Sequence, residues 1–111
     1  MEKEFKKMRS LTCIVNENGK EVATLYQQHT GYLDGKNIKK IPLKVPKTSE
    51  GLLFYLLNHI EHFELVPPGT RNVGEECIYT FKFNLDKSLN LLVTRDDKVL
   101  FDGLAKDFMP S

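Results

Sequence analysis

The chain has 111 residues, with 16 Lys and Arg against 15 Asp and Glu, and a formal net charge of +1. Nucleic-acid-binding and membrane-surface proteins usually carry a basic excess, so this charge balance indicates neither class. Hydrophobic residues make up 41% and aromatic residues 10% of the chain, which is typical of an ordinary globular domain. We therefore expect a single domain over residues 1–111, with residues 1–8 as a tail.

Targeting and redox features indicate a cytoplasmic protein. The charged N-terminal residues are not followed by the apolar core of a secretory signal, and no segment reaches the ~18 apolar residues of a membrane span. Cys13 and Cys77 lie in apolar, strand-like segments, where we expect two buried reduced thiols in place of a disulfide. We predict no contact with a membrane and a cytoplasmic location, in the host cell if the protein is phage-encoded.

The first predicted element is a β-hairpin. Apolar and polar residues alternate over 9–16, and the Asn-Gly pair at 18–19 then predicts a tight turn into a second strand over 21–28. Residues 29–47 lack periodicity and contain glycines and prolines, which predicts a long connection with a short extended piece at 38–45.

One amphipathic helix follows this connection. Thr48 or Ser49 can cap its start, and apolar residues then recur at helical spacing as far as Phe63. The prolines at 67–68 exclude a continuation, so we predict a helix over 49–64. Its apolar face is predicted to contain Leu52, Leu53, Leu56, Leu57, Ile60 and Phe63, and its solvent face Tyr55, His59 and His62. The two histidines can chelate a metal at this spacing, but no further ligand motif accompanies them, so we expect no metal site and no cofactor.

Three strands and a helical turn complete the predicted fold. Alternating apolar residues predict strands over 78–84, 89–94 and 98–102, joined by polar turns, and a short helical turn within 104–109. Two strands, one helix and three strands in this order predict an α+β fold (ββ-α-βββ). We expect an antiparallel five-stranded sheet packed against the one amphipathic helix.

Side chains suited to ligand binding gather where the second strand enters a glycine-containing loop. Aromatic, amide and imidazole groups in a loop suit recognition, although the two tyrosines can also pack over the sheet edge. The predicted binding residues here are Tyr26, His29, Tyr32 and Asp34.

Lysines dominate the next part of the connection. Residues 36–47 contain no acid and carry five positive charges, on Lys36, Lys39, Lys40, Lys44 and Lys47, so that the rest of the chain carries −4. This segment is either a solvated loop or a positive field that attracts phosphate or an acidic protein surface. We do not expect direct nucleic-acid binding, because no recognised aromatic and basic module accompanies the lysines.

Arg71 is the remaining candidate for binding. It lies in the predicted loop between the helix and the last three strands. Its guanidinium can fork onto a phosphate or carboxylate of a ligand, or it can pair with Glu75 or Glu76 of the same loop.

Three segments resemble a group of small uncharacterised proteins from phages, prophages and prokaryotes. Residues 25–35 (Leu-Tyr-Gln-Gln-His-Thr-Gly-Tyr-Leu-Asp-Gly) are similar to a tyrosine-containing and Asp-Gly-containing stretch of that group. Residues 66–79 and 99–103 are similar to its second half, where a loop with proline and glycine leads into a strand. The resemblance covers residues 11–108 and implies a phage-type setting for the predicted fold.

The chain shows no nucleophile elbow, P-loop, dinucleotide fingerprint or carboxylate dyad, so we predict a non-enzymatic binding protein. With the phage-type resemblance, the preferred hypothesis is a counter-defence protein of the anti-CRISPR kind. It either sequesters an immune signalling nucleotide, through the tyrosines, Arg71 and the lysines, or covers an immune protein such as a CRISPR effector. The alternatives are a host or prophage housekeeping module that oligomerises through its sheet edges, and a small phosphodiesterase or nuclease.

Overall fold

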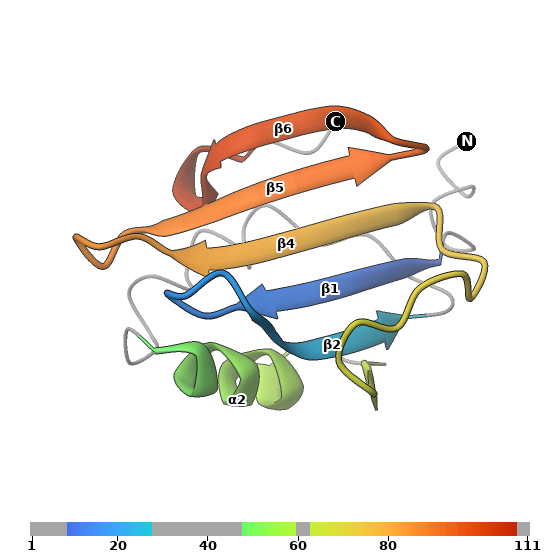
Figure 1. Ribbon diagram of the computed structural model, residues 1–111, viewed down its shortest axis with the longest axis horizontal. Coiled ribbons are helices and arrows are strands. Elements are labelled where there is room, and N and C mark those ends of the chain that lie inside the picture. The colour runs from blue at the N-terminus through green and yellow to red at the C-terminus, as the bar shows by residue number, and fades with distance from the viewer. Residues whose placement is uncertain (1–8, 28–47, 60–62, 109–111) are drawn as a thin grey trace.

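The computed structural model describes residues 9–27, 48–59 and 63–108, which form one mixed β-sheet with an α-helix packed against it (Figure 1). The α+β class predicted from the sequence is therefore confirmed. The predicted tail (1–8) and the extended piece at 38–45 lie outside the described residues. The elements in chain order are β1 (Ser10–Val15), β2 (Glu21–Gln27), α2 (Ser49–His59), β3 (Glu64–Val66), β4 (Cys77–Phe83), β5 (Leu89–Arg95), β6 (Lys98–Leu104) and the 3₁₀ turn η2 (Ala105–Asp107).

The sheet has six strands and is mixed, so the prediction of five antiparallel strands is wrong in these two respects. The strand order is β3-β2-β1-β4-β5-β6, and neighbouring strands are antiparallel except for β1 and β4, which are parallel. Nearly all residues of β1 are buried, which is typical of a central strand with both faces covered. The hairpin supplies one neighbour, and residues 67–76 return across the sheet to bring β4 to the other side in the direction of β1.

The sixth strand, β3, was not predicted because three residues are too few to show a period. The predicted helix extends to Glu64, but Glu64 begins β3 and α2 is assigned only as far as His59. Leu65 pairs with Leu25, so β3 forms the edge of the sheet beside β2.

The predicted hairpin of β1 and β2 is confirmed, and it contains a β-bulge that decides where Glu21 points. Gly19 in the turn has a φ of +84°, a conformation that favours glycine. The pairing skips Val22, so that Val15 lies opposite Glu21. Because opposed residues share a face, Glu21 joins the face of Val15 and Cys13, whereas in an unbroken register it would point to the other face.

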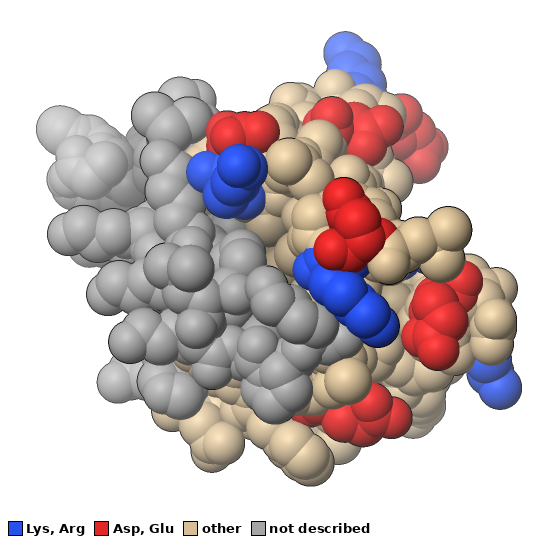
Figure 2. All heavy atoms as spheres, turned by 90° about the vertical axis from the view of Figure 1, so that its left-hand side faces the viewer, with Lys and Arg blue, Asp and Glu red and all other residues tan. Residues whose placement is uncertain are grey.

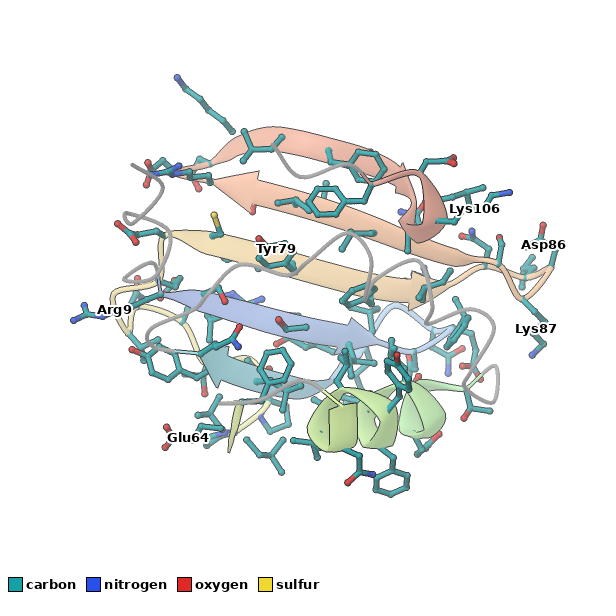
Figure 3. The ribbon with its side chains drawn as sticks, turned by 180° about the vertical axis from the view of Figure 1, so that it is seen from behind. Arg9, Glu64, Tyr79, Asp86, Lys87 and Lys106 are labelled. Carbon is teal, nitrogen blue, oxygen red and sulfur yellow. The ribbon has the colours of Figure 1, made fainter. Side chains whose placement is uncertain are left out.

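Helix α2 packs against the sheet on the side of β1 and β2 (Figure 3), and we call the face of the sheet that its core residues meet the helix face. Leu52, Tyr55 and Leu56, at i, i+3 and i+4, are buried in the core. The largest sheet residues in the same core are Ile14, Leu25, Tyr79, Phe81, Phe83, Leu89, Leu91 and Val93.

The helix is rotated relative to the sequence prediction, which placed Tyr55 on the solvent face. Tyr55 is only 8% exposed, whereas Phe54 and Leu57 are 61% and 38% exposed. Residues 52–57 are apolar or aromatic throughout, so their period does not define which side faces the sheet. Packing against the sheet decides the orientation.

The opposite face, which we call the loop face, is crossed by residues 67–76 over β1 and β2 (Figure 1). Leu11 and Cys13 of β1 are completely buried there. Cys77 belongs to the core on the helix face, so the sheet separates the two cysteines. Both are buried and neither forms a disulfide, as predicted.

Within the described part of the chain, two buried hydroxyl groups on the helix face have no hydrogen-bond partner. Ser10 Oγ and Thr12 Oγ1 both belong to completely buried residues of β1.

An unsatisfied buried polar group costs about 1–3 kcal/mol, so Thr12→Val, which keeps the side-chain shape, should raise the free energy of unfolding by about 1 kcal/mol. Urea denaturation measures this change. The control, Thr80→Val on the half-buried loop face of β4, should change stability by less than about 0.5 kcal/mol, and a destabilised Thr12→Val would contradict the prediction.

Candidate functional site

Two of the residues predicted to bind a ligand, Tyr26 and Arg71, lie in the described part of the chain. Tyr26 is half-buried in β2, opposite Leu11 of β1 and Glu64 of β3, which places it on the loop face. Arg71 lies in the connection of residues 67–76, which crosses the same face. The other predicted binding residues lie outside the described residues, namely His29, Tyr32, Asp34, Lys36, Lys39, Lys40 and Lys44.

Arg71 pairs with Glu21 of β2, whereas the sequence offered Glu75 and Glu76 as its acidic partners. Arg71 Nη2 lies 2.8 Å from Glu21 Oε1 and Nη1 lies 3.2 Å from Oε2, so both arms of the guanidinium meet the carboxylate. Nη1 also donates to the Thr70 carbonyl at 2.8 Å. The Arg71 side chain is 37% exposed and the Glu21 side chain 19% exposed, so the ion pair is partly shielded from solvent. It holds residues 67–76 against the sheet.

The Glu21 carboxylate is the centre of a wider hydrogen-bond network. It accepts hydrogen bonds from the Thr24 hydroxyl and, at 3.1 Å, from the Gly69 N–H. The same N–H reaches Thr24 Oγ1 at 3.0 Å, and Gly69 has a φ of +87°, which favours glycine. Glu21 therefore ties residues 69–71 to β2.

This network determines the ionisation of Glu21 and Cys13. Burial alone would raise the pKa of Glu21, but the hydrogen bonds from Arg71 and Thr24, the charge of Arg71 and the Gly69 N–H together lower that pKa to about 2. Burial, followed by the charge of Glu21, raises the pKa of Cys13 to about 12. Glu21 is therefore ionised at neutral pH while Cys13 stays a thiol, and these groups stabilise the fold without supplying a thiolate nucleophile.

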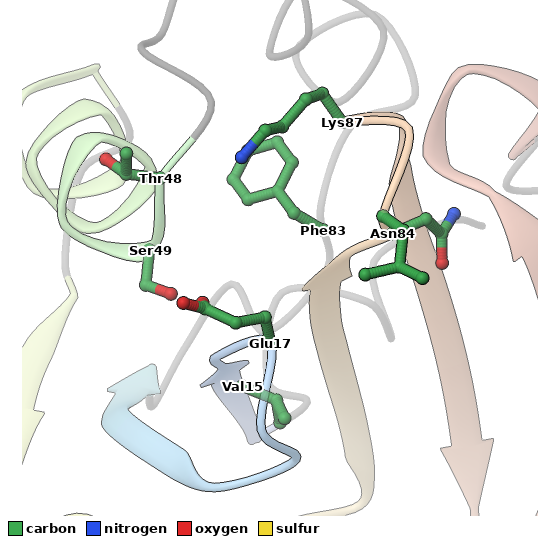
Figure 4. Close-up of a pocket in the computed structure, with 8 residues that line it drawn as sticks. Val15, Glu17, Thr48, Ser49, Phe83, Asn84 and Lys87 are labelled. Carbon is green, nitrogen blue, oxygen red and sulfur yellow. The ribbon is translucent and has the colours of Figure 1, made fainter.

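A small hollow opens where the β1–β2 turn, the β4–β5 turn and the start of α2 meet (Figure 4). Of the two predicted caps, Thr48 and Ser49, Thr48 caps α2, because its Oγ1 accepts the Gly51 N–H at 3.0 Å. Acidic and basic side chains alternate over this end of the molecule (Figure 2). The hollow has a volume of about 130 Å³ and is lined by Val15, Glu17, Thr48, Ser49, Phe83, Asn84, Leu85 and Lys87. An adjoining hollow of about 220 Å³ shares four of these residues, and both are below the ~300–1,000 Å³ of usual small-molecule pockets.

An exposed apolar surface, which we call the α2 surface, is formed by Phe54 and Leu57 on the outer side of the helix. The two side chains are 61% and 38% exposed and lie one turn apart. The sequence prediction assigned Leu57 to the core and did not select Phe54. The unbroken apolar run of residues 52–57 indicates that some of these side chains stay outside the core, but it does not show which.

Residues 9–27, 48–59 and 63–108 contain neither a metal-binding cluster nor a membrane-spanning helix. No group of three His, Cys, Asp or Glu side chains in these ranges is placed to hold a metal ion. His62 and the side chain of His59, which the sequence suggested as a chelating pair, lie outside the described part. No described helix is long and apolar enough to cross a membrane.

Comparisons with protein-family models, with curated proteins and with solved structures find no match to this chain.

The pH dependence of stability tests the Glu21 network. The pKa of Glu21 falls from 4.5 to about 2 on folding, so the folded chain binds fewer protons, and the stabilisation is present above pH 4.5 and lost as the pH falls towards 2. Glu21→Gln should lower the free energy of unfolding at neutral pH by about 2 kcal/mol and should lose less stability than the wild type over this acidic range. Urea denaturation at several pH values measures both effects. Glu64→Gln, an exposed acid of β3, is the control, and an identical pH dependence of Glu21→Gln and wild type would contradict the network.

Proposed function

We propose that this chain is a non-enzymatic binding protein that acts by covering a surface of another protein. The observation that carries the proposal is the α2 surface, where Phe54 is 61% exposed beside Leu57. The phage-type resemblance of the sequence supports a counter-defence setting. In that setting the covered protein is an immune protein such as a CRISPR effector.

The α2 surface has the physical features of a binding hot spot. Aromatic side chains dominate hot spots because they bury a large apolar area and have few rotatable bonds. Burying one mostly exposed phenylalanine contributes about 2 kcal/mol to association. The helix is anchored to the sheet by Leu52 and Leu56, so Phe54 stands on a rigid support and little freedom is lost on binding.

Two observations favour a protein partner over a signalling nucleotide. Nucleotide sequestration needs the Arg71 guanidinium to contact phosphate, but both of its arms already meet the Glu21 carboxylate. The hollows near α2, of about 130 and 220 Å³, are smaller than pockets that enclose a nucleotide. A flat protein contact needs neither a free arginine nor a deep pocket.

Phe54→Ala tests the proposal against a panel of purified immune proteins that includes CRISPR effectors. For a panel member that binds the wild type, Phe54→Ala should raise the Kd at least about tenfold in biolayer interferometry, because the aromatic contact is lost. The control is Leu85→Ala, which removes an apolar side chain that is 96% exposed in the β4–β5 turn and should leave the Kd within about twofold. Equal binding by Phe54→Ala and wild type would exclude the α2 surface, and a panel without any binder would contradict the counter-defence setting.

Isothermal titration calorimetry with a series of cyclic nucleotides separates the two forms of the counter-defence hypothesis. We expect no heat of binding from the wild-type chain, since Arg71 is held by Glu21. Heat that is present in the wild type and lost in Arg71→Ala would support sequestration of a nucleotide and would overturn the proposal of a protein partner.

A further inference from the structure

Among residues 9–27, 48–59 and 63–108, no segment crosses the loop face over β4, β5 and β6 (Figure 1). The side chains here are half-buried or exposed, in contrast to the completely buried Leu11 and Cys13 of β1. Strand pairing places them in neighbouring positions on one face. We call this region the open surface, and its main residues are Ile78, Thr80, Leu92, Thr94, Val99 and Asp102.

A second β-bulge adds an apolar side chain to the open surface. The pairing of β5 with β6 runs from Val93 opposite Phe101 to Thr94 opposite Val99, so Leu100 is skipped. Val99 therefore shares the face of Thr94 and is 62% exposed. Without the bulge Val99 would turn to the helix face.

The open surface carries opposite charges at its two ends. At one end, carboxylates surround a hollow of about 190 Å³ lined by Glu75, Glu76, Ile78, Thr94, Asp96 and Asp97. At the other end of β4, about 20 Å from Glu76 along the strand, Lys82 is exposed on the same face. The surface is thus a strip of apolar and threonine side chains, with Asp102 on β6, between a negative and a positive end.

We propose that a second copy of the chain packs face to face on the open surface, about a two-fold axis that runs across the strands. This axis reverses the strand direction, so Lys82 of each copy lies over the carboxylates of its partner. Ile78, Leu92 and Val99 of both copies are buried between the sheets, which pack in the aligned way of a β-sandwich. A two-fold axis along the strands would instead bring the two negative ends together.

The sheet edges are less suited to self-association than the open surface. β3 offers only three residues, and β6 carries exposed charges on Lys98 and Asp102 together with the bulge at Leu100. Short edges, charges and bulges are the features that prevent strand addition. The face-to-face dimer also leaves α2 uncovered, because α2 lies on the opposite side of the sheet.

Sedimentation equilibrium tests the dimer with variants whose charges are changed at either end of the open surface. The wild type should form dimers at high micromolar concentration, and Lys82→Glu should weaken the dimer about tenfold by placing acid against acid. Glu76→Lys/Asp96→Asn should weaken it similarly, and asparagine tolerates the positive φ of 52° at position 96. An equimolar mixture of the two variants should recover dimerisation, because both contacts again join opposite charges.

Two further variants make the test specific. Asp102→Asn should strengthen the dimer, since the two-fold axis brings the Asp102 side chains of both copies to the same side of the interface. Lys106→Glu, an exposed lysine of η2 outside the open surface, should leave dimerisation unchanged. A wild-type chain that stays monomeric at high micromolar concentration would overturn the proposal. A dimer whose dissociation constant is the same in the wild type and in both charge variants would also overturn it. Phe54→Ala should not affect dimerisation, so this result and the partner-binding result are independent.

Discussion

The Glu21 carboxylate is the constraint on which the strand order of the sheet depends. A parallel neighbour for β1 requires a chain that crosses back over the sheet. Residues 67–76 make this crossing without regular secondary structure of their own, and they are held to β2 by the Arg71 guanidinium and the Gly69 N–H, both on Glu21. The bulge at Val22 is as important as the ion pair, because it turns Glu21 to the loop face.

Because residues 67–76 are held on the loop face, the two faces of the sheet differ in what packs on them. On the helix face, α2, Ala105 and Phe108 pack in the core, and the outer side of α2 exposes Phe54, which we propose binds a partner. On the loop face, the described connection covers β1 and β2, and the open surface lies over β4, β5 and β6 with its separated charges. Because these two surfaces lie on opposite sides, the proposed binding of a partner and the proposed pairing of two copies would not compete. A dimer would present two α2 surfaces and would gain affinity for a partner with repeated sites.

Local patterns predicted the elements well wherever the period is regular and the turns are short. The strands predicted over 9–16, 21–28, 78–84, 89–94 and 98–102 are found as β1, β2, β4, β5 and β6, with ends shifted by one or two residues. The cap at Thr48 and the helical turn before residue 109 were also predicted. The prediction failed for β3, which has only three residues, and for the orientation of α2, whose apolar run has no polar side to face solvent.

By itself the sequence determined the α+β class, most strands and the burial of two cysteines outside any disulfide, because these depend on residue period and on turns of a few residues. The tertiary structure decided that Arg71 pairs with Glu21, fifty positions away, and that β4 lies parallel to β1. It also decided that Phe54 is exposed in place of Tyr55, and that Val99 and Lys82 share one surface with the carboxylates. The physical reason is that these features depend on contacts between segments far apart in the chain and on one-residue bulges, which reverse the face of a side chain without a signal in the residue period.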